Sequence, residues 1–198
     1  MGKKRIRDFG IVPGRVKTGE RNAITDVPGV RVGHCTVKTE ENHTGVTVIV
    51  PGPDNAFAKH YTAAAYIHNG FGKSAGVVQV EELGTLETPI ALTNTLNVGK
   101  VLDAMVEIVI EQCRKDGIEP QSINPVVGEC NDCRINHIQK RAIGEKEVRE
   151  AFALASEEFE EGDVGAGAGT TCYGMKGGIG SASRVITIGE KEYTIGVL

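Results

Sequence analysis

Apolar residues recur along the chain with two different periods, which together predict a mixture of strands and helices. Short runs rich in Val, Ile, Leu and Thr predict strands at 30–37, 45–50, 74–81, 89–93 and 124–128. Apolar spacings of three and four residues predict helices at 56–68, 98–114 and 145–160. Two further apolar segments, 184–188 and 193–198, flank a short polar turn and predict a hairpin.

The clearest of these helices is 98–114. Asn97 stands at its start as a candidate N-cap, and Gly117 follows its end. Asp103, Glu107 and Glu111 form one polar stripe, and apolar residues cover most of the remaining surface, so we expect this helix to be largely buried.

The interleaved order of helices and strands predicts one layered domain over residues 1–198, of the α/β or α+β class. Residues 195–198 are apolar strand sequence with no polar tail after them. We therefore expect more chain to belong to this protein than these 198 residues.

The overall charge argues against a nucleic-acid partner. Acidic residues outnumber basic ones by 26 to 22, which gives a net charge of -4. Lys3, Lys4, Arg5 and Arg7 form the one basic cluster, and we interpret it as a terminal segment that aids solubility. Without an apolar run of membrane-spanning length, and without a secretory pattern in residues 1–7, the sequence predicts a soluble cytoplasmic protein with no membrane partner.

Two of the five cysteines have a spacing that raises the question of a metal. Cys130 and Cys133, with His137 four residues further on, resemble half of a zinc site. A closed structural site needs four ligands, and a second pair of this kind is missing from the sequence. We therefore expect reduced packing cysteines and no metal or cofactor, with a redox role as the alternative.

Glycine is unusually frequent, at 26 residues, and it clusters between Gly162 and Gly180. The cluster ends in Gly180-Ser181, directly before a predicted strand. Glycine permits strained backbone, and a strained peptide bond here would let the Ser181 hydroxyl attack the Gly180 carbonyl and shift the chain from nitrogen to oxygen. Hydrolysis of that ester would leave Ser181 as a new N-terminus that carries both a nucleophile and a base. Composition alone favours the plainer alternative, a tight loop between strands.

A family resemblance changes that balance. The sequence resembles the DmpA-type aminopeptidases, which comprise the L-aminopeptidase/D-esterase and β-peptidyl aminopeptidase family, also called P1 or S58. The resemblance extends over nearly the whole chain, and its last motif is the most specific. The motifs that carry it lie, in family order, at residues 22–27, 29–30, 32–34, 69–72, 92–95, 98–99, 125–129 with Asp132, 165–167 and 176–184.

The resemblance implies a four-layer αββα sandwich of the α+β class, similar to N-terminal nucleophile hydrolases but with different connectivity. It implies an inactive precursor that cleaves itself at Gly180-Ser181, with 1–180 as the α-part and 181–198 as the start of the β-part. Ser181 would then act as the nucleophile of an aminopeptidase on small peptide, amide or ester substrates. Members need no metal and assemble as homo-oligomers of processed pairs. The family's supporting Ser and Glu would lie beyond Leu198.

The resemblance also implies a second catalytic residue. The family's oxyanion-hole asparagine follows a Glu-x-x-Asp-x-x-Leu-Asn pattern, which matches Glu129, Asp132, Ile135 and Asn136. An amide donor suits a developing oxyanion because it donates a hydrogen bond and keeps its proton. The alternative for Asn136 is a loop cap, since asparagine is common in such positions.

Two other functions stay open from the sequence. An acyltransferase of the ornithine-acetyltransferase type shares self-cleavage before its nucleophile, although those enzymes cleave before Thr and the residue here is Ser181. A protein without enzymatic activity, such as an unprocessed regulatory module, is the third hypothesis. The residue type preferred at the substrate's N-terminus, whether D, L or β, does not follow from the sequence.

Overall fold

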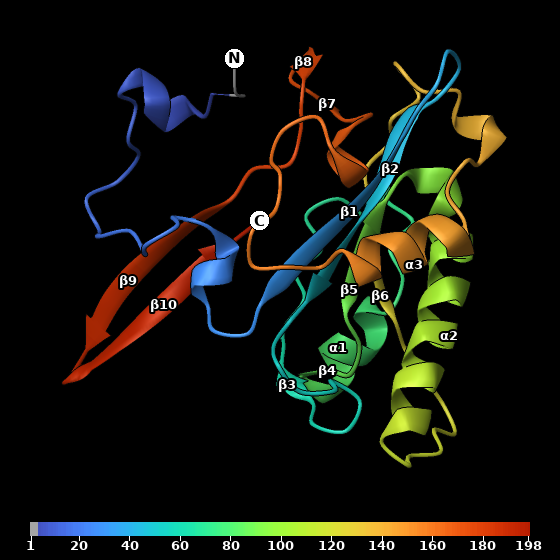
Figure 1. The fold of residues 1–198 in the computed structure, drawn as a ribbon, viewed down its shortest axis with the longest axis horizontal. Helices are drawn as coiled ribbons and strands as arrows, with labels where there is room; N and C mark the ends of the chain where they lie inside the picture. The colour runs from blue at the N-terminus through green and yellow to red at the C-terminus, as the bar shows by residue number, and fades with distance from the viewer. Residues whose placement is uncertain (1–3) are drawn as a thin grey trace. The chain divides into compact units, whose positions relative to one another are not determined.

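A computed structural model describes residues 4–198, so Lys3 of the basic cluster lies outside the described residues (Figure 1). The chain divides into two compact units. The central unit is Pro28–Ile179. The terminal unit combines the N-terminal segment up to Val27 with Gly180–Leu198.

The central unit is built on a four-stranded sheet with the order β1-β2-β5-β6. Its strands are β1 (Arg31–Lys38), β2 (His43–Val50), β5 (Ile90–Thr93) and β6 (Val126–Glu129). Neighbouring strands are antiparallel except for β5 and β6, which are parallel. A parallel pair requires a crossover connection, and the helix between β5 and β6 supplies it. The four strands predicted at 30–37, 45–50, 89–93 and 124–128 are confirmed.

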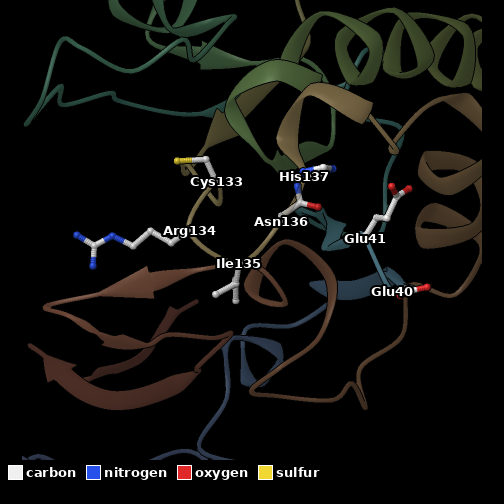
Figure 2. Close-up of a pocket in the computed structure, with 7 residues that line it drawn as sticks. All are labelled: Glu40, Glu41, Cys133, Arg134, Ile135, Asn136 and His137. Carbon is white, nitrogen blue, oxygen red and sulfur yellow. The ribbon is translucent and has the colours of Figure 1, made fainter.

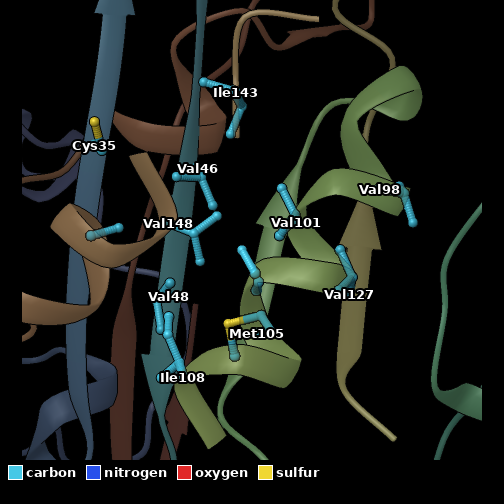
Figure 3. Packing of buried hydrophobic residues seen from close by; sticks show 13 residues of the cluster. Cys35, Val46, Val48, Val98, Val101, Met105, Ile108, Val127, Ile143 and Val148 are labelled. Atoms are coloured by element: carbon cyan, nitrogen blue, oxygen red, sulfur yellow. The ribbon is translucent and has the colours of Figure 1, made fainter. Parts of the chain in front are cut away.

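Two helices, α2 (Val98–Lys115) and α3 (Glu145–Ala153), pack on one face of this sheet (Figure 1). Figure 3 shows the core between them and the strands. Met105 is fully buried at its centre. The predicted helix at 98–114 is confirmed, but the expected cap is not: the Asn97 side chain makes no capping bond and donates from Nδ2 to the Ile143 carbonyl at 3.1 Å.

The helix predicted at 56–68 is wrong. This segment forms turns and the short strand β3 (Tyr61–Thr62), which pairs with β4 (Thr85–Leu86). Tyr66 is 87% exposed and Ile67 is 51% exposed, so the apolar spacing in the sequence does not correspond to a buried face. Without such a face, helix propensity alone is too weak to hold a helix in water.

The strand predicted at 74–81 is also wrong, because the helix α1 (Val77–Leu83) occupies most of it. Ala75 pairs with Val127 in a single bridge. Gly76 then adopts a left-handed conformation with φ of 79°, which ends the extended backbone and starts the helix. The valines favoured a strand locally, and the backbone of Gly76 overrides that preference.

Helix α3 begins where the sequence predicts but ends seven residues before the predicted end at 160. After the helix, the main chain of Ser156 pairs with Val32 of β1 through two hydrogen bonds of 3.0 and 3.1 Å. Pairing with the sheet therefore replaces the last helical turns. The rest of the central unit consists of loops, the 3-10 turns η3 (Thr95–Asn97), η4 (Ile138–Lys140) and η5 (Gly165–Gly167), and the hairpin of β7 (Thr171–Cys172) and β8 (Met175–Lys176).

The terminal unit contains a two-stranded hairpin of β9 (Ala182–Ile188) and β10 (Lys191–Val197), as the sequence predicts. Two 3-10 turns, η1 (Ile6–Phe9) and η2 (Ile24–Asp26), belong to the same unit. A Cβ on Gly196 of β10 would lie 2.7 Å from the carbonyl oxygen of Ile24, so the hairpin packs directly on the η2 backbone. Among the described residues, no helix is long and apolar enough to cross a membrane.

Replacement of Met105 by Ala should lower the free energy of unfolding by about 2–5 kcal/mol, because it removes buried contacts and leaves a cavity in the central core. Glu107→Ala, an exposed position on the same helix, should change it by less than about 0.5 kcal/mol. Urea denaturation of both variants measures the difference. Equal losses in the two variants would contradict the placement of Met105 in the core.

Candidate functional site

Ser181 lies directly before β9 in the terminal unit, and only 8% of its surface is exposed. Its hydroxyl donates a hydrogen bond to the Val197 carbonyl oxygen at 2.8 Å. It also accepts one from the main-chain N–H of Ile24 at 2.7 Å. The candidate nucleophile is therefore held between η2 and β10.

Asn22 and Asp26 fix the chain around Ser181. Asn22 has a left-handed backbone with φ of 49°, and its Oδ1 accepts a hydrogen bond from the Ser183 N–H at 3.0 Å. Asp26 accepts one from the Ser183 hydroxyl at 2.6 Å and from the N–H groups of Arg21 and Ala23. Burial opposes ionisation of Asp26, but these hydrogen bonds, with that of Ser183 first, outweigh it and lower the pKa of the carboxyl.

The partners of the Ser181 hydroxyl limit what it can do in the uncleaved chain. A main-chain N–H stabilises negative charge on the oxygen, but a main-chain carbonyl cannot take up the hydroxyl proton near neutral pH. A base is therefore needed in addition to Ile24 and Val197. An α-amine on Ser181 itself would be such a base, and it would exist only after cleavage of the bond before it.

The glycine cluster of the central unit forms a closely packed loop that leads to Gly180. Gly162 and Ile179 form a two-bond bridge with N···O distances of 2.7 and 2.8 Å. A Cβ on Gly178 would lie 2.5 Å from the Gly162 carbonyl oxygen, so only glycine fits there. Lys176 donates from Nζ to the carbonyl oxygens of Gly167 and Gly177. These contacts hold in place the residues that directly precede Gly180 in the chain.

Asp163 anchors this loop to the strands. Its carboxylate accepts from Lys38 at 2.6 Å, Lys176 at 3.1 Å and His43 at 3.1 Å. Burial raises the pKa of Asp163, but the hydrogen bonds from Lys38, Lys176 and His43 outweigh it and hold that pKa well below its usual range. The sequence did not single out Asp163, because its partners come from distant segments.

His34 forms a second link between the strands and the loop. Its Nε2 lies 3.1 Å from the Glu160 carbonyl oxygen, which can only accept, so this nitrogen carries the proton. Nδ1 then accepts from the Thr47 hydroxyl at 2.9 Å, and that hydroxyl oxygen accepts from the Ala166 N–H at 3.1 Å. Burial lowers the pKa of His34.

Asn136 lies in the loop after β6, and 5% of its surface is exposed. Its Oδ1 accepts from Asn42 Nδ2 at 3.0 Å and from the His43 N–H at 3.2 Å. Its Nδ2 donates one proton to Asp132 at 2.9 Å. Because the main-chain N–H of His43 can only donate, the atom of the Asn136 amide that faces it must be the oxygen. One Nδ2 proton is thus used within the loop network, and an oxyanion would need the second.

A pocket of about 590 Å³ lies beside Asn136 in the central unit (Figure 2). Its lining carries two carboxylates and one guanidinium. The residues that line it are Glu40, Glu41, Cys133, Arg134, Ile135, Asn136 and His137. Asn136 belongs to the central unit, whereas Ser181 belongs to the terminal unit.

Cys130 and Cys133 carry no disulfide, but both are exposed, so the prediction that they are packing cysteines is wrong. Within residues 4–198, no three or more His, Cys, Asp or Glu side chains are grouped so that they could hold a metal ion. Although Cys130 is exposed at the surface, neighbouring atoms shield its thiol in part from water, and this desolvation is the largest cause of its raised pKa. Nearby acidic side chains, Glu129 first, raise that pKa further. A raised pKa disfavours the thiolate that nucleophilic and redox cysteines require.

Arg7 was interpreted from the sequence as part of a solubilising segment, and this interpretation is wrong. The Arg7 guanidinium donates to the Ser181 carbonyl oxygen at 2.8 Å and to the Asn22 carbonyl oxygen at 3.1 Å. No sequence signal connects Arg7 with a residue 174 positions away.

Comparison with known proteins identifies a family. The family model described as Peptidase family S58 matches residues 22–198. The chain is 38% identical over 204 residues to the β-peptidyl aminopeptidase BapA of Sphingosinicella xenopeptidilytica. That match covers 98% of this chain and 50% of the relative, so the chain spans about half the length of the curated relatives that it matches.

Two solved structures are similar to the chain at the level of the fold. The PH0078 protein from Pyrococcus horikoshii OT3 gives a TM-score of 0.92 at 42% identity, covering 98% of this chain and 57% of that one. The L-aminopeptidase D-Ala-esterase/amidase from Ochrobactrum anthropi gives a TM-score of 0.89 at 34% identity, covering 98% and 56%. The latter is described as a new variant among the Ntn hydrolase fold. The predicted class, α+β and related to N-terminal nucleophile hydrolases, is confirmed.

Acidification should destabilise the protein partly through His34. Because burial lowers the folded-state pKa below the ordinary value of 6.5, the neutral ring contributes stability above that pH. This contribution is lost as the pH falls below 6.5 and through the lowered pKa. Urea midpoints measured across this range should fall less steeply for His34→Gln, whose amide does not titrate. Identical slopes for the two proteins would contradict this role of His34.

Proposed function

The chain belongs to peptidase family S58, and on this premise we propose that it is the nucleophile-bearing part of a self-processing serine aminopeptidase. Ser181 is the proposed nucleophile, and Gly180-Ser181 is the proposed cleavage site. The observation that carries the proposal is the placement of the Ser181 hydroxyl: it directly follows the packed glycine loop and is held between the Ile24 N–H and the Val197 carbonyl.

In the proposed self-cleavage, the Ser181 oxygen attacks the carbonyl carbon of Gly180. The carbon–nitrogen bond of the peptide then breaks, and an ester joins Gly180 to the Ser181 oxygen. The proton that the hydroxyl loses is balanced by the one that the departing Ser181 nitrogen gains as it becomes an amine. Water hydrolyses this ester and gives a carboxylate on Gly180 and a free hydroxyl on Ser181. Residues 1–180 and 181–198 are then parts of separate chains.

The proposed peptidase reaction repeats this chemistry on a substrate. The free α-amine of Ser181 takes the hydroxyl proton as the oxygen attacks the substrate carbonyl, and it returns that proton to the leaving amine. The Ile24 N–H, which already donates to this oxygen, supports the negative charge that develops on it. The product is an acyl-enzyme that water hydrolyses, with release of the substrate's N-terminal residue.

Asn136 is the proposed oxyanion donor. The proposal uses the second Nδ2 proton and requires Asn136 and Ser181 to reach one substrate carbonyl. The bonds to Asn42, His43 and Asp132 support it, because they hold the amide in one orientation.

The proposed substrates are small peptides, amides or esters with a free N-terminal amine. The relatives support an aminopeptidase over an acyltransferase, since they include a β-peptidyl aminopeptidase and an L-aminopeptidase. A homo-oligomer of processed pairs and a location in the cytoplasm remain predictions.

Replacement of Ser181 by Ala should abolish both self-cleavage and hydrolysis of an aminoacyl anilide, because one hydroxyl serves both reactions. Intact mass spectrometry of the full-length protein should give two fragments meeting at Gly180-Ser181 for the natural protein and one for the variant. Ser122→Ala, an exposed serine, is the matched control and should behave like the natural protein. An uncleaved Ser181→Ala protein with normal peptidase activity would rule out Ser181 as the nucleophile.

Replacement of Asn136 by Ala should lower kcat by about 100- to 1000-fold with little change in KM, and it should slow self-cleavage. If Asn136 is only a loop cap, the variant should instead lose about 0.5–2 kcal/mol of stability and keep its kcat. Steady-state kinetics and urea denaturation separate the two results. Asn131→Ala is the control, because Asn131 caps the same loop through the Cys133 N–H and should affect stability alone.

A further inference from the structure

A buried network of polar side chains leads to Asn136 in the central unit. Asn94 donates from Nδ2 to the Thr44 hydroxyl oxygen at 2.9 Å, and that hydroxyl donates to Asp132 Oδ2 at 2.6 Å. The other carboxylate oxygen, Asp132 Oδ1, accepts from Asn136 Nδ2 at 2.9 Å. All four side chains are buried. The network therefore ends on the amide nitrogen of the proposed oxyanion donor.

We propose that Thr44 and Asp132 are positioning residues, which aim the free N–H of the Asn136 amide at the oxyanion of the substrate. This inference deepens the proposed function and rests on it, because it presupposes that Asn136 is the donor. Asn94 serves the same arrangement by fixing the Thr44 hydroxyl. Thr44 and Asp132 act through Asn136 and need no contact with the substrate.

The direction of each hydrogen bond in the network follows from the chemistry of its groups. A carboxylate can only accept, so both Thr44 and Asn136 donate to Asp132. The Thr44 hydroxyl has one proton and uses it for this bond, so its oxygen accepts from the amide of Asn94. The network thus has a single arrangement of donors and acceptors.

The bond to Asp132 decides where the free N–H of Asn136 points. Oδ1 of the Asn136 amide is held by Asn42 Nδ2 and by the His43 N–H, and Nδ2 is held by Asp132. Because resonance keeps an amide planar, fixing its oxygen and one N–H also fixes the direction of the second N–H. A donor with a fixed direction suits an oxyanion, since it does not have to reorient as charge develops.

Thr44 ties Asp132 to the sheet. The torsion that orients a carboxylate is broad, so a single hydrogen bond would leave the group free to rotate. Thr44 lies in β2, an inner strand of the four-stranded sheet, and it holds Oδ2 while Asn136 occupies Oδ1. A Cβ on Gly169 would lie 2.6 Å from the Asp132 Cβ, so the glycine loop packs directly against this residue. Asn136, although it lies in a loop, is therefore held by a residue of the sheet.

Stability alone does not account for these residue types. A buried carboxylate without a cation costs stability, and no ion pair within residues 4–198 involves Asp132. Asn94 Oδ1 is buried and has no hydrogen-bond partner among the same residues, which is also unfavourable. Apolar side chains would fill these positions without either cost. Unfavourable local choices of this kind are typical of functional sites.

The test compares kcat and KM for an aminoacyl anilide in the full-length protein, with kcat calculated per processed molecule from the intact mass. Thr44→Val removes the hydroxyl at nearly constant volume and should lower kcat by about 10- to 100-fold with little change in KM. Thr44→Ser keeps the hydroxyl and should restore the natural kcat.

Thr88→Val is the matched control, because Thr88 is another buried threonine of the central unit. Its hydroxyl donates to the Pro89 carbonyl at 2.8 Å, before the start of β5, whereas Asn94 follows the end of that strand. This variant should lower the urea midpoint and keep the natural kcat.

Double variants separate positioning from general damage to the fold. If Thr44 acts through Asn136, Thr44→Val should cause no further loss of kcat in an Asn136→Ala protein. Asp132→Asn has the same shape but only one oxygen that can accept. It should also lower kcat on its own and cause no further loss together with Asn136→Ala.

A Thr44→Val protein with the natural kcat would overturn the inference, and so would losses that multiply in the double variants. If Thr44→Val does not fold, Asp132→Asn decides by the same measurements. Failure of both to fold would overturn the inference too, because the network would then serve stability. An uncleaved natural protein, or an Asn136→Ala variant with the natural kcat, would overturn the proposed function and this inference with it.

Discussion

The central unit depends on places where two segments of main chain touch directly, with no side chain between them. A Cβ on Gly33 would lie 2.0 Å from the Ala151 carbonyl oxygen, so β1 approaches α3 as closely as backbones allow. A Cβ on Gly45 would lie 2.3 Å from the Gly165 carbonyl oxygen, which brings β2 equally close to the glycine loop. The high glycine content therefore reflects specific contacts on both faces of the sheet and not a flexible chain.

The sequence predicts those elements whose pattern matches their burial. Helix α2 has a wide apolar face that the sheet covers, so periodicity locates it to within one residue at its end. In the segments 56–68 and 74–81, several apolar residues stay exposed. The spacing of apolar residues in these segments therefore does not predict which element forms. The end of α3 depends on pairing between Ser156 and Val32, which no local pattern encodes.

The same distinction applies to the candidate site. The motif before Ser181 is contiguous, so the position of the proposed nucleophile can be predicted from the sequence through the family resemblance. Its surroundings come from segments far apart: Ile24 lies 157 residues away and Arg7 lies 174 residues away. Contacts over such separations depend on the folded terminal unit, and composition had suggested a different role for Arg7.

Under the proposed self-cleavage, these long-range contacts of the terminal unit would become contacts between two separate chains. The terminal unit joins the segment up to Val27 with Gly180–Leu198, so cleavage at Gly180-Ser181 would leave it composed of two chains. The bonds from Arg7 and Ile24 to Ser181, and from Asp26 to Ser183, would then connect one chain to the other. If the two fragments separated, the nucleophile and its α-amine would lose the residues that surround them. Retention of the N-terminal segment would therefore be a condition of activity, because it holds in place the residue that cleavage creates.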